Sequence, residues 1–201
     1  MYRTAAELSA ATGPVRLAGM APPTLTTARL ELRPITADDL DDLAALYADP
    51  EVMRYIGTGQ PRTRAETIGR LHLQVEHWRT HGFGFFMLRL RGEPAASAAG
   101  CASAPGAFVG RCGLQHLGNT GAVELGYTLA KPYWGQGYAT EAARACVGYA
   151  FGALGLERIV AIARPANAAS RRVLEKLGMR LVKMTEWDDG PVVWYELDRP
   201  G

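Results

Sequence analysis

The sequence predicts an α/β protein of the mixed α+β kind, in which helices pack on both faces of a central mixed sheet. Two patterns favour this class: segments in which apolar and polar residues alternate, and segments in which apolar residues recur at helical spacing. In chain order these segments read β-α-α-β-β-β-α-β-α-β-β. Such an interleaved order is typical of helices layered on one sheet. A chain of 201 residues is long enough for one domain with a sizeable core.

The first strand and the first helix are predicted at the start of this order. Residues 28–35 alternate apolar and polar side chains, as a half-buried strand does. Thr36 is the candidate N-cap of the helix, and four aspartates between positions 38 and 42 place negative charge where the helix dipole favours it. Asp49-Pro50 ends this helix, because proline disfavours helical geometry in the residue before it. Its buried stripe is expected at Leu40, Leu43 and Leu46.

The second helix is predicted from Thr63 to Gly82, and Glu66 stands at the spacing of a capping box. Its apolar face is expected at Ile68, Leu71, Val75 and Trp78. Residues 91–107, rich in Gly, Ala, Ser and Pro, are expected to form a flexible loop. The remaining predicted strands are 83–90, 108–117, 122–130, 156–163, 180–186 and 191–198, and the remaining helices are 138–153 and 168–177.

Composition and charge exclude several classes of protein. The formal net charge is only +2 and acidic residues alternate with basic ones, so a nucleic-acid binder is not expected. No apolar run approaches the roughly 18 residues that span a bilayer. The cysteine count is odd and no Cys-x-x-Cys occurs, which argues against a disulfide framework and favours a reducing, cytoplasmic location. The cysteines are Cys101, Cys112 and Cys146.

Residues 1–24 are expected to form a loosely ordered extension, and residues 25–201 a single domain. Met20 is an alternative start of translation. No metal site is expected from the histidines, because His77 and His81 are four residues apart without the Glu of a His-Glu-x-x-His pattern. The other histidines are His72 and His116.

The segment Tyr133 to Glu141 connects a predicted strand to a predicted helix through two glycines. Glycines let the backbone turn tightly and approach a ligand closely. Free N–H groups at the start of the helix make an anion site, which suits a pyrophosphate. The segment lacks the Lys-Ser/Thr pair of a P-loop and the third glycine of a dinucleotide fold. A plain strand-to-helix turn is the alternative interpretation.

A second block lies about thirty residues further on, where Arg164-Pro165-Ala166-Asn167 leads into a short helix that closes with Leu177-Gly178-Met179. With this combination the sequence resembles the GNAT superfamily of N-acetyltransferases, most of all the branch that includes the RimJ/RimL-like ribosomal-protein alanine acetyltransferases. The resemblance runs from about residue 27 to 197. It also includes Arg29-Leu30-Glu31-Leu32-Arg33-Pro34, Asp49-Pro50-Glu51-Val52-Met53 and Glu124-Leu125-Gly126-Tyr127.

The resemblance implies acetyl-CoA as the acyl donor and assigns residues to it. Backbone N–H groups of the Gly-rich turn would bind the pyrophosphate, Asn167 would help to hold the pantetheine arm, and Ser170 would protonate the departing CoA thiolate. Trp134 departs from the family, which has Gln or Arg there. A helix N-cap and a first-turn serine are the structural alternatives for Asn167 and Ser170. The candidate acetyl-CoA contacts are Leu125, Gly126, Tyr127, Gly135, Gln136, Gly137, Tyr138, Ala139, Thr140, Asn167 and Arg172.

The predicted strand 122–130 places Glu124 on one face with small residues, and places large apolar side chains on the other. The small face is expected to leave a groove for the acyl-pantetheine arm, and strand N–H groups would stabilise the oxyanion. Glu124 is the candidate general base, because an amine must lose its proton before it attacks. An ion-paired structural glutamate is the alternative, and Glu186 and Asp188 are weaker rivals. Arg164, Arg171 and Arg172 are candidates for contacts with the CoA phosphates.

These observations predict an acetyl-CoA-dependent N-acetyltransferase that acts by direct attack in a ternary complex. No covalent intermediate is expected, because no cysteine lies in the motif blocks. The acceptor is a protein N-terminus or a small amine. The alternative from another class is a non-catalytic acyl-CoA-binding sensor. The expected partners are acetyl-CoA and the amine, with no nucleic acid and no membrane, and the chain is expected to be a monomer or a homodimer.

Overall fold

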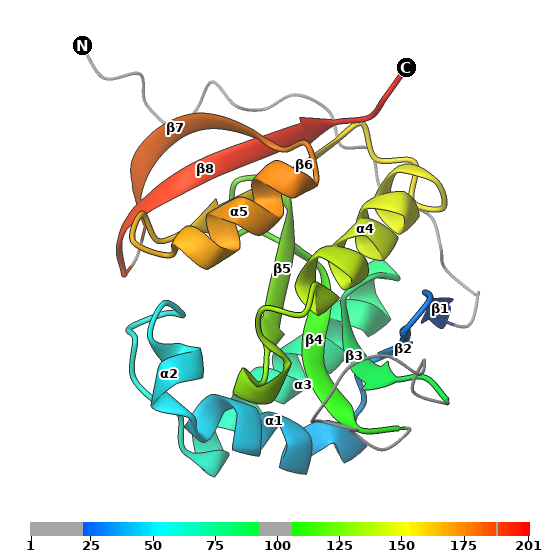
Figure 1. Ribbon diagram of the computed structural model, residues 1–201, viewed down its shortest axis with the longest axis vertical. Coiled ribbons are helices and arrows are strands. Elements are labelled where there is room, and N and C mark those ends of the chain that lie inside the picture. The colour runs from blue at the N-terminus through cyan, green and yellow to red at the C-terminus, as the bar shows by residue number, and fades with distance from the viewer. Residues whose placement is uncertain (1–21, 93–105, 188) are drawn as a thin grey trace.

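The computed structural model describes residues 22–92, 106–187 and 189–201. Their strands form one eight-stranded sheet in the order β1-β2-β3-β4-β5-β6-β8-β7 (Figure 1). Neighbouring strands are antiparallel except β5 and β6, which are parallel. The sheet is therefore mixed, as the sequence predicts. The strands are β1 (Leu25–Thr26), β2 (Leu30–Pro34), β3 (Phe85–Leu90), β4 (Phe108–His116), β5 (Val123–Leu129), β6 (Arg158–Ala163), β7 (Arg180–Trp187) and β8 (Gly190–Asp198).

The helices cover both faces of this sheet, which confirms the predicted α+β class. The buried side of α4 packs on β4 and β5. There the sulfur of Cys146 lies 3.6 Å from the sulfur of Cys112. Both thiols are free and buried. On the opposite face Tyr47 of α1 stacks with Arg111 of β4. The α-helices are α1 (Leu40–Ala48), α2 (Pro50–Met53), α3 (Arg64–His81), α4 (Tyr138–Phe151) and α5 (Ala168–Lys176), and short 3-10 turns lie at Ala37–Asp39 and Lys131–Tyr133.

The predicted strands and helices are all present, with ends shifted by a few residues. Three short elements were not predicted: β1, α2 and the 3-10 turn Lys131–Tyr133. Asp49-Pro50 does end α1, but the same pair also begins α2, since the Asp49 side chain accepts a 2.8 Å hydrogen bond from the Glu51 N–H. Proline fits the first helical position, where its missing N–H costs nothing. The pair thus separates two helices instead of ending helical structure.

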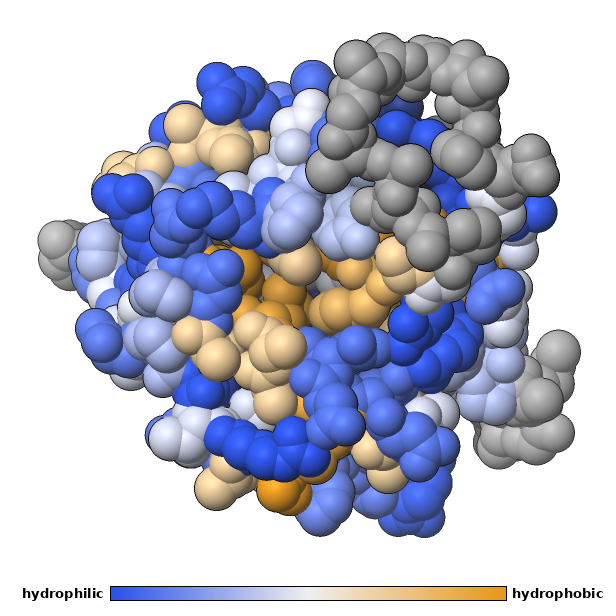
Figure 2. Space-filling view, turned by 60° about the horizontal axis from the view of Figure 1, so that its bottom comes forward, coloured by the Kyte–Doolittle hydropathy of each residue, from blue (hydrophilic) through white to orange (hydrophobic). Residues whose placement is uncertain are grey.

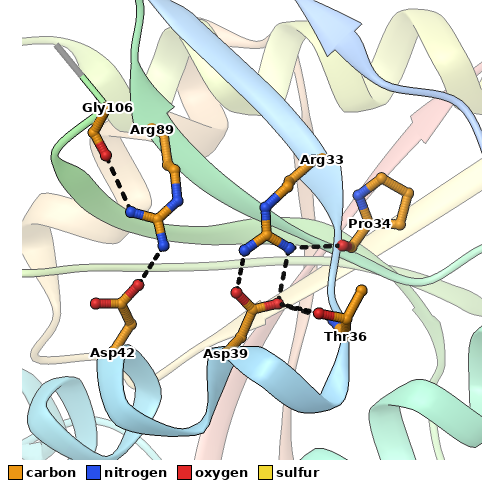
Figure 3. Close-up of polar contacts among 7 residues, drawn as sticks. All are labelled: Arg33, Pro34, Thr36, Asp39, Asp42, Arg89 and Gly106. Carbon is orange, nitrogen blue, oxygen red and sulfur yellow. Dashed lines mark hydrogen bonds and ion pairs between the residues drawn. The ribbon is translucent and has the colours of Figure 1, made fainter.

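The aspartates at the start of the first helix bind strand arginines, a use that the dipole argument did not predict. Asp39 is buried and forms a two-pronged ion pair with Arg33 of β2, and it also accepts a 2.8 Å hydrogen bond from the Thr36 N–H (Figure 3). Asp42 pairs with Arg89 of β3, which also donates to the Gly106 carbonyl at 2.9 Å. These contacts fix the first helix against two strands of the sheet.

The buried stripe of α3 differs from the predicted one. Its capping box is present, with the Thr63 N–H donating to Glu66 at 2.7 Å, and Gly82 ends the helix in the left-handed conformation at φ 73°. Ile68, however, is 38% exposed, so its predicted burial is wrong. The stripe that faces the sheet includes two polar positions that hydrophobicity alone misses. Its buried members are Thr67, Leu71, Gln74 and Trp78.

Two further expectations fall mostly outside the described residues. The extension predicted for residues 1–24 is described only from residue 22, and the loop predicted for 91–107 lacks residues 93–105. Cys101 and Asp188 also lie outside the described residues. Within the described ranges, the helices are too short or too polar to cross a membrane.

Candidate active site

The sheet opens between β5 and β6, and this opening organises the site. In the described part of the chain the two strands share one register pair, Glu124 with Val160, although each strand runs on beyond it. On its other edge β5 pairs with β4 along its whole length. The edge of β5 from Leu125 onward therefore lacks a strand partner on the β6 side. Its N–H groups at this edge are available to a ligand.

The two faces of β5 carry different chemistry. Tyr127 lies on the face that packs on α4 and α5, because its register partner is Cys112, which contacts Cys146 of α4. Glu124 and Thr128 lie on the opposite face and are buried. A Cβ atom on Gly126 would lie 3.1 Å from the Phe85 ring. The small-residue face is thus covered by other side chains, so the groove predicted on it is wrong; the open feature is the strand edge.

Glu124 is a buried carboxylate with only polar, uncharged hydrogen-bond donors. The Gln115 amide on β4 donates to it at 2.7 Å, and the Ile162 N–H of β6 also donates. Burial raises the pKa of Glu124 above its usual value, and these hydrogen bonds with the charges of Arg111 and Arg70 oppose that rise. A carboxylate with a raised pKa is a better proton acceptor near neutral pH than an exposed one.

On the other face, Tyr127 of β5 joins Ser170 of α5. The Tyr127 hydroxyl lies 2.9 Å from Ser170 Oγ and donates to the Ser170 carbonyl at 3.0 Å. Burial raises the pKa of Tyr127, so its hydroxyl stays protonated. The Ser170 N–H in turn donates to the side chain of Asn167 at 3.1 Å, which makes Asn167 the N-cap of α5. Two hydroxyls thus meet across the opening between β5 and β6.

The Gly-rich turn between β5 and α4 leaves the backbone N–H groups at the start of α4 exposed. Gly135 and Gly137 have φ values of 73° and 85°, which L side chains rarely adopt. Gly137 is the N-cap of α4 and is exposed, so the first N–H groups of the helix, those of Tyr138, Ala139 and Thr140, face outward without helical partners. Trp134 binds within the turn, since its indole N–H donates to the Leu129 carbonyl at 2.7 Å.

Arg29 supports this turn from the N-terminal part of the chain, a role that the sequence did not reveal. Its guanidinium pairs with Glu141 of α4, donates to the Gln136 carbonyl at 3.0 Å and stacks on the Tyr138 ring at 4.3 Å. The Thr27 hydroxyl donates to the same Glu141 carboxylate at 2.6 Å. Burial opposes ionisation of Glu141, but these hydrogen bonds hold its pKa below the usual value. The segment between β1 and β2 therefore holds the turn and the start of α4 in place.

The three arginines considered for the CoA phosphates have different surroundings. Arg164 donates to the carbonyls of Gly57 and Asp189, and so joins the segment after α2 to the β7–β8 hairpin. Arg171 donates to the Tyr195 hydroxyl at 3.2 Å. Arg172 is exposed and has no hydrogen bond or ion pair with a described residue. Of the three, only Arg172 has an uncommitted guanidinium.

A small cavity lies between α2 and the last hairpin. It encloses about 90 Å³ and is bounded by the end of β6, including Ile162, whose N–H binds Glu124. Glu186 lies nearby in the chain but is exposed on β7. In Figure 2, which looks at the end of the molecule that carries α1, a hollow with exposed hydrophobic residues opens at the centre of a hydrophilic face. The other residues that bound the cavity include Tyr55, Gly57, Arg164, Trp187 and Asp189.

Comparison with known proteins agrees with this geometry. Residues 29–180 match the model of the acetyltransferase (GNAT) domain family. The uncharacterized protein YkkB of Bacillus subtilis (strain 168) is 32% identical over 86% of this chain and 94% of its own length. The FsC-acetyl coenzyme A-N(2)-transacetylase of Aspergillus fumigatus is 34% identical over 81% of this chain and 67% of its own length.

A solved structure gives the same result. The crystal structure of the acetyltransferase from Agrobacterium tumefaciens str. C58 is 30% identical, with a TM-score of 0.73, and the match covers 89% of this chain and 95% of the other. The family match spans most of the sheet, the Gly-rich turn and α5. The chain therefore belongs to the GNAT family and is an N-acetyltransferase that uses acyl-CoA as its donor.

Proposed function

We propose that the protein transfers acetyl from acetyl-CoA to a primary amine by direct attack in a ternary complex. One observation carries this proposal. Glu124 and the Tyr127–Ser170 pair lie on opposite faces of β5, next to the edge where β5 parts from β6. A thioester laid along this edge would have a proton acceptor on one side and a proton donor on the other.

The pyrophosphate of acetyl-CoA would bind the first N–H groups of α4, where the helix dipole favours an anion. The pantetheine arm would then follow the free edge of β5, with Leu125, Gly126 and Tyr127 as its strand contacts and Asn167 at the start of α5. Arg172 is free to pair with a CoA phosphate. The nucleotide end of acetyl-CoA would thus lie at the protein surface, and its thioester would reach the buried part of β5.

The groups on the two faces of β5 would act at successive steps of the reaction. Glu124 takes a proton from the ammonium group, directly or through water, and the neutral amine attacks the thioester carbonyl. A β5 N–H group at the free edge binds the oxyanion of the tetrahedral intermediate. When the C–S bond breaks, Ser170 donates its proton to the CoA thiolate and regains one from the acylated nitrogen, which is still protonated after the attack. The proton on Glu124 leaves to solvent. The Tyr127 hydroxyl keeps its own proton and positions the Ser170 hydroxyl. The products are the acetylated amine and free CoA.

We place the acceptor in the cavity between α2 and the β7–β8 hairpin. Ile162 and Arg164, which bound it, lie beyond the single β5–β6 register pair, on the side where the strands part. The cavity thus lies at the end of β6 that continues past Val160, the register partner of Glu124. The motif blocks favour the RimJ/RimL-like branch, so an N-terminal α-amine of a protein is the first class of acceptor to test.

The test is to incubate the protein with acetyl-CoA and a pool of amines that contains N-terminal peptides, amino acids, polyamines and aminoglycosides. We expect free thiol to appear only with an acceptor, and mass spectrometry to find one acetyl group on the consumed amine. Saturable binding of acetyl-CoA without turnover on any amine would instead support the acyl-CoA sensor. Acetylation of the enzyme before the acceptor is added would contradict direct attack.

A further inference from the structure

Three histidines meet outside the acyl-transfer site, where the end of α3 approaches the end of β4. His77 and His81 share a face of α3 because they are four residues apart. His116 is the last residue of β4. One ring nitrogen from each histidine lies within 4.8 Å of the other two. The rings contact one another at tilted or edge-on angles, with centroids 4.4 to 5.3 Å apart.

The hydrogen bonds of His77 assign its tautomer. Its Nδ1 lies 2.8 Å from the Phe83 carbonyl, which can only accept, so Nδ1 carries the hydrogen. The Nε2 atom therefore has a lone pair, and this atom points toward His116. Histidines that bind metals commonly donate their other ring N–H to a backbone carbonyl in this way.

The spacing of two donor atoms matches a tetrahedral metal. Zinc–nitrogen bonds of 2.0–2.1 Å at tetrahedral angles put two ligand nitrogens about 3.3–3.4 Å apart. His77 Nε2 and His116 Nδ1 are 3.3 Å apart. His81 makes no hydrogen bond to a described residue, so its ring can turn toward the same point at little cost. The Nε2 atom of His77 would give up the hydrogen bonds that it accepts from the His116 N–H at 3.1 Å and from His116 Nδ1. The hydrogen on His116 Nδ1 would move to Nε2 of the same ring, which frees Nδ1 for the metal.

We propose that His77, His81 and His116 bind one divalent transition metal ion of the zinc type, with water in the fourth position. Three imidazole nitrogens suit Zn²⁺, Co²⁺, Ni²⁺ or Cu²⁺ and are poor ligands for Mg²⁺ or Ca²⁺. No metal was expected from the sequence, because His77 and His81 lack the Glu of a His-Glu-x-x-His pattern. His116 comes from a strand that follows far along the chain, and only the fold brings it to α3.

The location connects this site with the general base. His116 directly follows Gln115, whose amide donates to Glu124 at 2.7 Å. His77 and Gln115 also line a cavity of about 250 Å³ beside Phe85. A bound metal would hold the end of β4 against α3. It would therefore act on the orientation of Gln115 and not on the acetyl-CoA edge of β5.

The test is metal binding to untagged protein that has been freed of metal by a chelator. Co²⁺ is titrated while the visible spectrum is followed, because tetrahedral Co²⁺ absorbs far more strongly than hydrated Co²⁺. Zn²⁺ is then titrated by calorimetry and should displace the cobalt. We expect one ion per chain and a tetrahedral spectrum. His81→Ala and His116→Ala should each weaken binding at least tenfold, since even the loss of an outer partner of a ligand costs about 10–100-fold.

His72→Ala is the matched control, because His72 is exposed on the same helix but outside the cluster. It should bind cobalt and zinc as the unchanged protein does. A thermal melt of each variant without metal shows whether it is folded. The proposal is overturned if the unchanged protein binds no zinc at micromolar concentrations, or if His81→Ala and His116→Ala bind it as tightly as His72→Ala. Neither result would contradict the proposed acetyl transfer, because that activity is measured in a separate assay.

Discussion

The two faces of β5 bury polar groups in different ways. On the α5 side the Tyr127 hydroxyl has two partners on Ser170, and nothing there needs a charge. On the other side Glu124 is buried with a raised pKa, and no arginine or lysine of the described residues forms an ion pair with it. The face with Tyr127, which we call the acid face, keeps a proton on a hydroxyl. The face with Glu124, which we call the base face, makes a carboxylate readier to take a proton. This difference is what an acid and a base on opposite sides of a thioester require.

Arg111 provides the positive charge nearest in effect to the buried Glu124 carboxylate without forming an ion pair with it. Its guanidinium lies 4.0 Å from the centre of the Phe85 ring and is buried. Its Nε and one terminal nitrogen have no hydrogen-bond partner among the described residues, and burial lowers its pKa. The arginine therefore supplies positive charge to Glu124 at a distance. A direct ion pair would instead hold the carboxylate ionised and make it a weak base.

The strongest test of the acid face is Ser170→Ala. We expect kcat to fall roughly 10²–10⁴-fold, as for the loss of a general acid, while acetyl-CoA affinity changes little.

Tyr127→Phe keeps the ring and removes only the hydroxyl that lies beside Ser170. It should cost about 2–10-fold in kcat, the worth of one hydrogen bond. Steady-state kinetics and calorimetry with acetyl-CoA measure both; lost affinity with an unchanged kcat would make Ser170 a structural residue.

On the base face, Glu124→Gln keeps the size of the side chain and removes the basic oxygen. The rate at neutral pH should fall by roughly 10²-fold, in line with general-base contributions. Raising the pH toward the pKa of the amine should recover part of the loss, because solution then supplies the neutral amine. The measurement is kcat/KM against pH for both proteins. Parallel profiles would mean that Glu124 is structural.

The same substitution should change stability in a direction that the pKa sets. The folded-state pKa of Glu124 is raised, so the folded protein holds this proton more tightly than the unfolded chain does. Glu124 therefore costs stability above its folded pKa, and the cost disappears as the pH falls toward the unfolded value near 4.3. Glu124→Gln should raise the Tm at pH 7, by about 2–4 °C for each kcal/mol removed. A lower Tm at pH 7 would show that the charge is stabilising.

The sequence predicted the parts of this site that depend on neighbours in the chain. The Gly-rich turn, the N-cap at Asn167 and the strand with Glu124 are local patterns. It did not predict Gln115 and Ile162 as partners of Glu124, Arg29 as the support of the turn, or His116 beside His77, because these meet only when the sheet forms. The groove on the small face was wrong because a side chain from β3, Phe85, fills the space that glycine leaves.

The Gly-rich turn follows β5 in the chain, and substitutions in it should affect only the binding of acetyl-CoA. Gly137→Asp adds a negative charge where the pyrophosphate would bind, and we expect acetyl-CoA affinity to fall about tenfold or more. Gly137→Ala is the control, since it shares the strain of φ 85° without the charge. Calorimetry should show a much smaller loss for alanine. Equal losses would mean that the backbone conformation, and not the anion site, is what Gly137 provides.

The smallest effect is expected where neither face of β5 is involved. A chain that begins at Met20 should keep its Tm within about 1 °C and its acetyl-CoA affinity, because residues 1–19 lack the apolar periodicity needed to pack on a core. Contacts of the described residues start later: β1 begins at Leu25, and the Thr27 hydroxyl binds Glu141 at 2.6 Å. A chain that begins at Ala28 loses both and should melt lower and bind acetyl-CoA more weakly. Thermal melts and calorimetry on the two truncations would separate them. If the longer one is already destabilised, residues 1–19 contribute to the domain.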